Sequence, residues 1–318
     1  MRNDIIYYSV GALMYCPANS TNIIGNLLEN KFGNKFSLAF CLEDTINDDM
    51  VEEAEEQLIK NLKTLYKLRE EHFYLPKIFI RVRNKNQIEK VLNGIGNAHN
   101  IITGFNIPKF NIENAEGYIK AVKDMSEKLN HKFWLMPILE SDDLIDLRTR
   151  YVYLHTIKDI LDKNEDIVLN VRVGGNDLSH AFGLRRHSNE TVYDIKPVAS
   201  VLVDILTVFS RNYVVSGAVW EYYNGENWAE GLADEIKMDM LSGFVGKTAI
   251  HPKQISIINE NCKVLKEDYD DAKSILGWDK LNPSFVSGST NKSRMNEYKT
   301  HYNWAEKIMY LAKYYGVR

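Results

Sequence analysis

Cysteine is scarce in this chain, and so are several signals that would place it in a specialised class. Its 318 residues include three cysteines, Cys16, Cys41 and Cys262, without a CxxC spacing. This predicts buried thiols of a reduced, cytoplasmic protein rather than a disulfide framework. The longest apolar run, residues 5–16, is shorter than a membrane span and carries no basic leader. A formal net charge of −4, from 39 basic and 43 acidic residues, favours neither nucleic acid nor an anionic membrane as a partner.

Several motifs of catalysis and nucleotide binding are also missing. Neither HExxH nor GxSxG occurs, and no cluster has the spacing of zinc ligands. The segment GFVGKT at residues 243–248 is two residues short of a phosphate-binding loop, and AIHP follows where a helix should begin. The turn CPANSTN after the first predicted strand lacks the glycine-rich fingerprint of a dinucleotide-binding sheet. These absences exclude a P-loop and argue against an open, doubly wound sheet.

Strand-like and helix-like segments alternate along most of the chain. Eight predicted strands cover residues 7–16, 36–44, 77–84, 101–110, 132–140, 166–175, 213–223 and 244–252. The predicted helices cover residues 20–32 (capped by Ser20), 47–71, 86–93, 112–129, 142–162, 191–210, 228–242 and a segment from 253. Such alternation predicts a parallel sheet, and eight units favour a closed (β/α)8 TIM barrel. We expect the barrel to occupy residues 1–262 and a C-terminal helical extension to occupy residues 263–318.

Polar side chains follow the predicted strands, at the end where barrel enzymes place their active sites. They are Asn19, Glu43, Asp44, Arg81, Arg83, Lys109, Glu140, Asn176, Asp177, Glu221 and His251. Exposed strand ends are often polar without a function. That reading does not explain why carboxylates follow the second, fifth and sixth strands while cations follow the third and fourth.

Two of these carboxylates, Glu140 and Asp177, come from adjacent predicted strands. Side by side they would repel each other unless one took up a proton. A divalent cation removes the repulsion, and two carboxylates with substrate oxygens and waters are typical ligands of Mg²⁺. Gly174 and Gly175 just before Asp177 would let a substrate or metal-bound waters approach the backbone, with Asn176 beside them. The competing interpretation is that each acid is a surface cap.

Two cations complete the candidate site. Arg81 can bind the oxygens of a carboxylate or a developing enolate through its planar guanidinium group. It could equally pair with Glu43 or Asp44 on the neighbouring strand, and the two roles are compatible. Lys109 could act as a second cation or form a Schiff base, and a nearby metal site favours the electrostatic role.

Seven short motifs occur in the order found in the citrate lyase β-subunit-like proteins. They are ALMYCPAN, FCLEDTI, IRVRN, IPKF, LMPILES, VGGNDLSHAFGLR and GKTAIHPKQI. Over residues 9–262 the chain therefore resembles this family of Mg²⁺-dependent carbon–carbon bond lyases, related to the HpcH/HpaI aldolases and built on a pyruvate-kinase-like barrel. The resemblance implies Mg²⁺, or Mn²⁺ in its place, on Glu140 and Asp177. It also implies substrate binding by Arg81, with the catalytic acids Glu43 and Asp44 beside it.

The expected activity is aldol- or Claisen-type cleavage or condensation of a small oxo- or hydroxy-carboxylic acid or its acyl thioester, through an enolate. Lys109, Gly175 and Asn176 are the further expected substrate contacts. Two alternatives stay open: a non-catalytic barrel subunit of a stress-response assembly, and a phosphoenolpyruvate-type enzyme on the same fold.

The last part of the chain departs from that family. Many members carry a GxMIDxP lid, whereas this chain has a different segment at residues 288–316, as in a divergent branch found near tellurium-resistance and stress genes. The tail is rich in aromatic residues, which we expect to be buried against protein because exposing them to water is unfavourable. A helix is expected over residues 301–315. The resemblance implies a homo-oligomer, a trimer or hexamer, in which residues 287–301 cover an active-site mouth. A polar linker before an ordinary last helix is the alternative.

Overall fold

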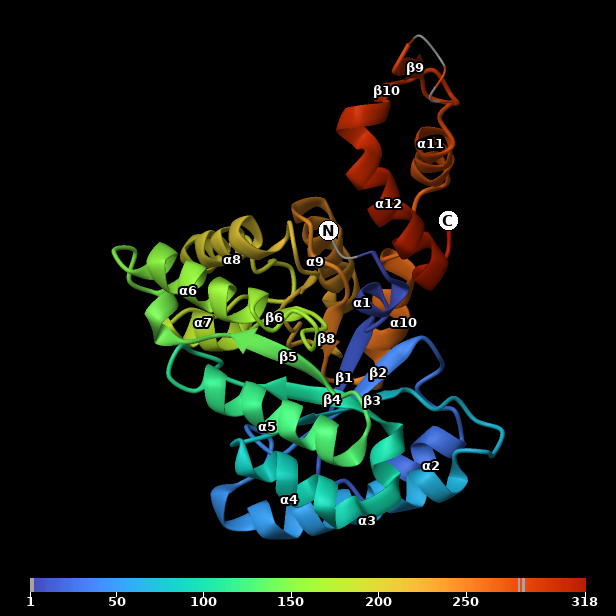
Figure 1. Ribbon diagram of the computed structural model, residues 1–318. Helices are drawn as coiled ribbons and strands as arrows, with labels where there is room; N and C mark the ends of the chain where they lie inside the picture. The colour runs from blue at the N-terminus through green and yellow to red at the C-terminus, as the bar shows by residue number, and fades with distance from the viewer. Residues whose placement is uncertain (1–2, 280, 282–283) are drawn as a thin grey trace.

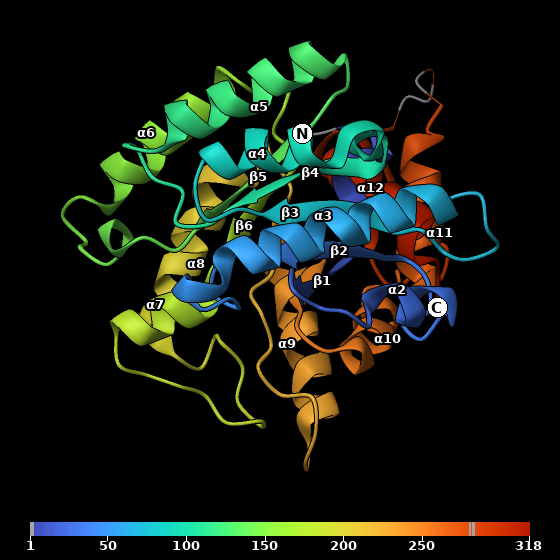
Figure 2. The ribbon, with the colours of Figure 1, turned by 90° about the horizontal axis from the view of Figure 1, so that it is seen from below.

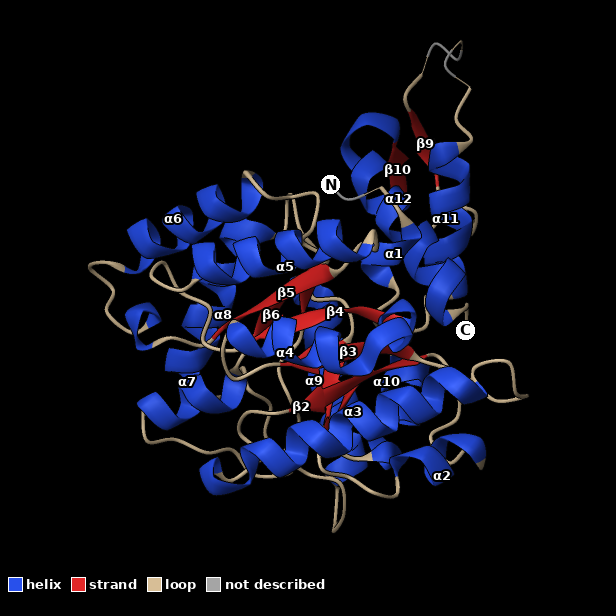
Figure 3. Ribbon diagram, turned by 60° about the horizontal axis from the view of Figure 1, so that its bottom comes forward, coloured by secondary structure: helices blue, strands red, loops and turns tan. Residues whose placement is uncertain are grey.

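A barrel of parallel strands forms the centre of the computed structural model, which describes residues 3–279, 281 and 284–318. The strands lie within a shell of helices (Figure 3). They are β1 (Ala12–Pro17), β2 (Phe36–Cys41), β3 (Lys77–Arg81), β4 (Ile102–Ile107), β5 (Trp134–Leu139), β6 (Val171–Val173), β7 (Val215–Ser216) and β8 (Lys247–Ala249). Hydrogen-bonded neighbours follow the order β7-β6-β5-β4-β3-β2-β1-β8. Gly217 also pairs with Lys247, between β7 and β8, so the sheet is nearly closed and the predicted (β/α)8 fold class is confirmed.

Helices connect the strands around the outside. They are α2 (Ile23–Leu28), α3 (Val51–Leu68), α4 (Asn86–Ile95), α5 (Ala115–Leu129), α6 (Arg150–Asp162), α7 (Gly175–Ala181), α8 (Lys196–Phe209), α9 (Trp228–Ser242) and α10 (Pro252–Asn261). Figure 2 shows α3, α4 and α5 side by side along one side of the barrel. In α3, Leu58, Leu62 and Leu65 are fully buried, because their spacing places them on one face of the helix. No helix of the described residues is long and apolar enough to cross a membrane.

The inside of the barrel changes from apolar to polar along its axis. Near the N-terminal ends of the strands, Leu13, Phe79 and Met136 form a buried apolar cluster. Two residues further along β1 and β3 stand Tyr15 and Arg81, which therefore point inward as well. The barrel thus has an apolar base and a polar mouth.

A short helix closes the apolar base and corrects one prediction. Residues 7–16 were expected to be a strand, but α1 (Ile5–Tyr8) precedes β1. Asp4 caps α1 by accepting a hydrogen bond of 2.9 Å from the backbone N–H of Ile6, and Gly11, at a φ of 68°, turns the chain into the strand. The apolar run predicted as one strand therefore serves two elements, because α1 packs Ile6 and Tyr7 against the cluster at the barrel base.

Other boundaries also differ from the prediction. Asn22, not Ser20, is the residue before the first turn of α2, and its side chain makes no capping bond. The sixth and seventh strands, expected over 166–175 and 213–223, have regular pairing only over Val171–Val173 and Val215–Ser216. The helix predicted from residue 191 begins at Lys196, where a proline occupies the first turn.

Beyond α10 the chain forms what we call the C-terminal arm, residues 263–318. It contains α11 (Lys266–Leu276), the strand pair β9 (Val286–Gly288) and β10 (Met295–Glu297), and α12 (Tyr298–Tyr315). The arm projects from the barrel with its strand pair at the tip (Figure 1). The helix predicted over 301–315 is present and begins three residues earlier than expected.

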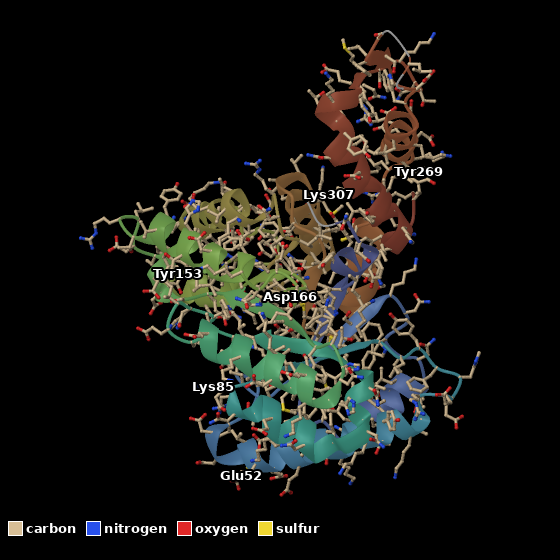
Figure 4. The ribbon with its side chains drawn as sticks, viewed as in Figure 1. Glu52, Lys85, Tyr153, Asp166, Tyr269 and Lys307 are labelled. Atoms are coloured by element: carbon tan, nitrogen blue, oxygen red, sulfur yellow. The ribbon has the colours of Figure 1, made fainter. Side chains whose placement is uncertain are left out.

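The arm is attached beside the base of the barrel. Tyr310 of α12 stacks on Tyr8 of α1, with ring centroids 4.8 Å apart. Lys307, labelled in Figure 4 where α12 meets the barrel, donates a hydrogen bond of 2.8 Å to the carbonyl oxygen of Gly243. Both contacts lie at the N-terminal ends of the strands. The arm therefore leaves the barrel on the side opposite its own mouth.

Candidate active site

Five of the predicted site residues meet at the barrel mouth. Nη2 of Arg81 lies 2.5 Å from Glu43 Oε2, 2.8 Å from Asp44 Oδ2 and 3.6 Å from Glu140 Oε1. Nζ of Lys109 lies 2.6 Å from Glu43 Oε1 and 3.4 Å from Asp44 Oδ1. Two cations and three carboxylates from the ends of β2, β3, β4 and β5 thus form one network.

Arg81 makes the ion pairs expected of it and keeps one donor unused. Its side chain is buried, and Nε has no hydrogen-bond partner. Burial opposes its charge, but Tyr15, Glu140 and Glu43 outweigh that effect and hold the pKa of Arg81 above its ordinary value. A permanently charged guanidinium with a free donor can still bind a ligand oxygen.

The backbone of Lys109 is in the left-handed region, with a φ of 47°, which is uncommon for a residue with a side chain. Its N–H donates a hydrogen bond of 2.9 Å to Glu140 Oε1. Burial would lower the pKa of Lys109, but the hydrogen bond and charge of Glu43 raise it above its ordinary value. Lys109 therefore stays protonated, which supports the electrostatic role over a Schiff base.

Glu140 is the carboxyl group at the mouth whose pKa is raised strongly. Its side chain is 2% exposed. Burial raises its pKa to about 8, with a further increase from the charge of Asp177, against the opposing effect of Arg81. In this buried position beside another acid, the anionic form of Glu140 is unfavourable unless a further positive charge binds nearby.

Gly174 and Gly175 are sites where the surrounding structure leaves no room for a side chain. A Cβ atom built on Gly174 would lie 2.1 Å from Glu140 Oε2, and one built on Gly175 would lie 2.7 Å from the side chain of Ala218. The missing side chains therefore make room for Glu140 and for the packing of Ala218, and the approach of a ligand to this backbone stays a prediction. Asn176, also expected to contact substrate, is exposed.

Asp177 lies in the first turn of α7 and is partly exposed. Its charge acts on both Glu140 and Lys109, which places it at the same mouth. Within residues 3–279, 281 and 284–318, no three His, Cys, Asp or Glu side chains gather as a ready-made metal cage. A metal here would take two carboxylates and complete its coordination with water or substrate oxygens.

Comparison with models of protein families identifies the family to which this chain belongs. The model described as "C-C_Bond_Lyase of the TIM-Barrel fold" matches residues 4–317. The chain belongs to the C–C bond lyases of the TIM-barrel fold. It is therefore a lyase, and the predicted relationship to the citrate lyase β-subunit-like proteins is confirmed at the level of the family.

Solved structures share the fold of this C–C bond lyase at low sequence identity. A citrate lyase from Burkholderia xenovorans has a TM-score of 0.73 and 14% identity, covering 97% of this chain and 93% of its own. CitE from Mycobacterium tuberculosis, in complex with magnesium, acetoacetate and coenzyme A, has a TM-score of 0.62 and 16% identity. The match covers 96% of this chain and 99% of the CitE chain. The citrate lyase β subunit of the same organism, with oxaloacetate and magnesium, has a TM-score of 0.52 and 17% identity. The match covers 81% of this chain and 99% of that subunit. No curated protein sequence matches the chain.

Arg83 of this C–C bond lyase holds the loop that carries the two acids. Its guanidinium group donates to the carbonyl oxygens of Leu42, Glu43 and Ile46, at 3.1, 3.2 and 2.7 Å. It also pairs with Asp48. Arg83 was predicted only as one of the polar residues that follow the strands, and the structure gives this arginine a bracing role.

Sequence reasoning missed three inward-facing residues of the polar part of the barrel: Tyr15, Asn106 and Arg172. Asn106 donates a hydrogen bond of 3.3 Å to the hydroxyl oxygen of Tyr15, and the centre of the Arg81 guanidinium lies 5.4 Å from the Tyr15 ring centroid. Tyr15 and Arg172 each interrupt an otherwise apolar strand, and Asn106 stands between Phe105 and Ile107 in β4. That interruption was the available signal.

Proposed function

We propose that this lyase cleaves or forms a carbon–carbon bond of a small oxo- or hydroxy-carboxylic acid, or of its acyl thioester, with Mg²⁺ held by Glu140 and Asp177. One observation carries the proposal. A buried carboxyl group, Glu140, stands beside a second carboxylate with its pKa raised to about 8, at the mouth of a barrel whose family breaks carbon–carbon bonds.

The residues present fit a divalent cation. Glu140 Oε1 is held by the N–H of Lys109, whereas Oε2 lies against Gly174, where no side chain intervenes. The proximity of Asp177 raises the pKa of Glu140, and a cation between them would reverse that effect. Two hard oxygen donors with open positions suit Mg²⁺, and Mn²⁺ would fit the same donors.

When bound, Mg²⁺ would act as a Lewis acid toward the oxygens of the substrate. Arg81 would place its charge and its free Nε–H near the oxygen that gains negative charge as the bond breaks, which lowers the barrier electrostatically. Glu43 and Asp44 would hold the guanidinium in that orientation. Lys109 would contribute a second fixed positive charge and would fix Glu140 through its backbone N–H.

The known structures of similar fold support the substrate class. CitE from M. tuberculosis was solved with acetoacetate and coenzyme A, and the citrate lyase β subunit of that organism with oxaloacetate. These ligands are small oxo acids or an acyl carrier. A bound divalent cation would add the positive charge that Arg81 and Lys109, already paired with acids, do not supply alone.

The test is an activity screen with purified protein. 2-Oxo and 3-hydroxy acids, each with and without coenzyme A, would be incubated with Mg²⁺, and products identified by mass spectrometry. We expect Mg²⁺-dependent cleavage or condensation of at least one acid, which Arg81→Met abolishes. Turnover that persists in EDTA, or in Arg81→Met, would contradict the proposed mechanism.

We also propose a homo-oligomer, a trimer or hexamer, in which residues 287–301 of one arm approach the mouth of a neighbouring barrel. Two observations support it. The arm leaves its own barrel at the end opposite the mouth (Figure 1). Its tip exposes apolar side chains, including Val286 at 47% and Met295 at 59%, which favour burial against another surface.

A further inference from the structure

Exposed apolar side chains gather on one part of the outer surface of the barrel. On α6 and the loop before it, Leu147 is 67% exposed, Tyr151 54% and Val152 70%, and Val203 on α8 is 50% exposed. The helices α3, α4 and α5, which the structure describes completely, expose none of their large apolar side chains. Single exposed apolar residues are common on proteins, but a cluster of them marks an interaction surface.

These four residues form one surface, which we call the α6–α8 patch. The hydroxyl of Tyr151 donates a hydrogen bond of 3.1 Å to Asp204 Oδ1 on α8. Arg150 of α6 pairs with the same carboxylate at 2.9 Å. Because Val203 precedes Asp204, these contacts bring the exposed residues of the two helices close together. The patch is therefore a fixed part of the barrel wall.

A second exposed apolar surface lies on the arm tip, which we define as residues 285–298. Within β10, Met295 is exposed whereas Asn296 is 3% exposed, because successive side chains of a strand point to opposite faces. The register of β9 and β10 places Val286 on the same face as Met295. Asn296 faces the rest of the arm, so the face with Val286 and Met295 points away from it.

The two surfaces differ in charge. The arm holds 10 of the 39 basic and 7 of the 43 acidic residues, so its net charge is +3 and that of the barrel is −7. Lys292, in the turn of the arm tip, is exposed and forms no ion pair with any described residue. At the edge of the patch, Asp142 and Asp143 are exposed and likewise have no cationic partner in the part of the chain that the structure describes. Opposite charges around two apolar surfaces favour their association.

One copy of the chain cannot bring its arm tip to its own patch. Figure 1 and Figure 2 show the arm and α6 on opposite sides of the barrel. The contacts of Lys307 and Tyr310 hold α12 against the base of the barrel. An association of these two surfaces therefore joins two copies head to tail, and such contacts build a closed ring when the rotation between copies closes.

We propose that the arm tip of one copy docks on the α6–α8 patch of the next copy. This inference rests on the homo-oligomer of the proposed function and names the surface that receives the arm. Val286 and Met295 would lose their contact with water against the patch, and Lys292 would approach the acids at its edge. The patch begins at Leu147, seven residues after Glu140, so the docked tip would lie at the rim of the neighbouring mouth.

The test measures the molar mass of variants of the whole chain by light scattering, at a concentration at which the wild-type protein is assembled. Met295→Glu and Val152→Glu each place a charge on one of the two surfaces, and each should reduce the mass to that of the 36.7 kDa monomer. A mixture of the two variants should form a dimer, because each supplies the surface that the other has lost. Leu241→Glu is the control, since Leu241 is 80% exposed on α9, outside both surfaces, and it should keep the wild-type mass. Circular dichroism checks that each variant is folded.

The outcomes separate this inference from the proposals on which it rests. Wild-type assembly in either folded variant, or a mixture that stays monomeric, overturns the docking surface. Assembly that is lost in Met295→Glu and kept in Val152→Glu would show that the arm docks elsewhere on its neighbour. A monomeric wild-type protein overturns both the oligomer and this inference, and its Mg²⁺-dependent turnover would still test the lyase. If a variant does not fold, Val286→Glu replaces Met295→Glu and Val203→Glu replaces Val152→Glu.

Discussion

Replacing Glu140 with glutamine should remove a large pH dependence from the stability of the metal-free protein. Burial raises the pKa of Glu140 from its ordinary value of 4.5 to about 8. Between those values the folded state holds a proton that the unfolded chain releases. The free energy of unfolding therefore falls as pH rises through this range. Glu140→Gln imitates the protonated acid at every pH and should not show this loss.

The magnitude follows from the same two pKa values. Linkage at about 1.4 kcal/mol per pH unit gives the wild-type protein a loss of about 3.5 kcal/mol between pH 5 and pH 8 from this one group. Such a loss is a large fraction of the stability of an ordinary domain. Addition of Mg²⁺ at pH 8 should restore stability to the wild-type protein, because a ligand that binds only the folded state stabilises it.

The assay is urea unfolding at pH 5, 6, 7 and 8 in the presence of EDTA, followed by tryptophan fluorescence. Because other groups also titrate, the wild-type slope is compared with those of Glu140→Gln and of Glu116→Gln, which changes an exposed acid on α5. Equal slopes in wild type and Glu140→Gln would refute the argument, as would a wild-type protein that gains stability relative to that variant as pH rises.

Three further predictions concern other parts of the molecule. Gly174→Ala would place a Cβ atom 2.1 Å from Glu140 Oε2, so we expect a loss of about 1–3 kcal/mol in urea unfolding and weaker Mg²⁺ binding; unchanged values would show that the backbone has room. Burial lowers the pKa of Lys307 to about 8, so between pH 8 and pH 10 the unfolded chain holds a proton that the folded protein has released. The free energy of unfolding of the wild-type protein should therefore rise with pH in this range, and that of Lys307→Met should change less. Equal pH dependence in the two proteins would contradict this. Truncation after Leu281 removes α12 and should abolish both assembly and ligand binding; light scattering and calorimetry would expose the alternative, a monomer that binds ligand normally.

The repeating pattern of the chain predicted the barrel because apolar strands and amphipathic helices differ in period. The same alternation predicted that the residues after each strand would meet, and Glu43, Arg81, Lys109 and Glu140 do meet. The roles assigned to these residues remain predictions, because geometry alone does not report chemistry.

Features that depend on packing between distant segments could not be predicted. The apolar run at residues 5–16 gives no sign of where α1 ends and β1 begins, because both elements bury their side chains at the barrel base. Gly174 is explained only by the approach of Glu140 from another strand. Arg172 lies in the short run VRV, where sequence alone does not say which side chain faces the barrel axis.

Calorimetric titration of Mg²⁺ into metal-free wild-type protein and Asp177→Ala tests the central claim most directly. Glu116→Ala serves as the matched control, since it also removes one acid but lies on an outer helix. The account predicts binding to the wild-type and control proteins that Asp177→Ala abolishes. Unchanged Mg²⁺ binding in Asp177→Ala would contradict the assignment of the metal site to Glu140 and Asp177.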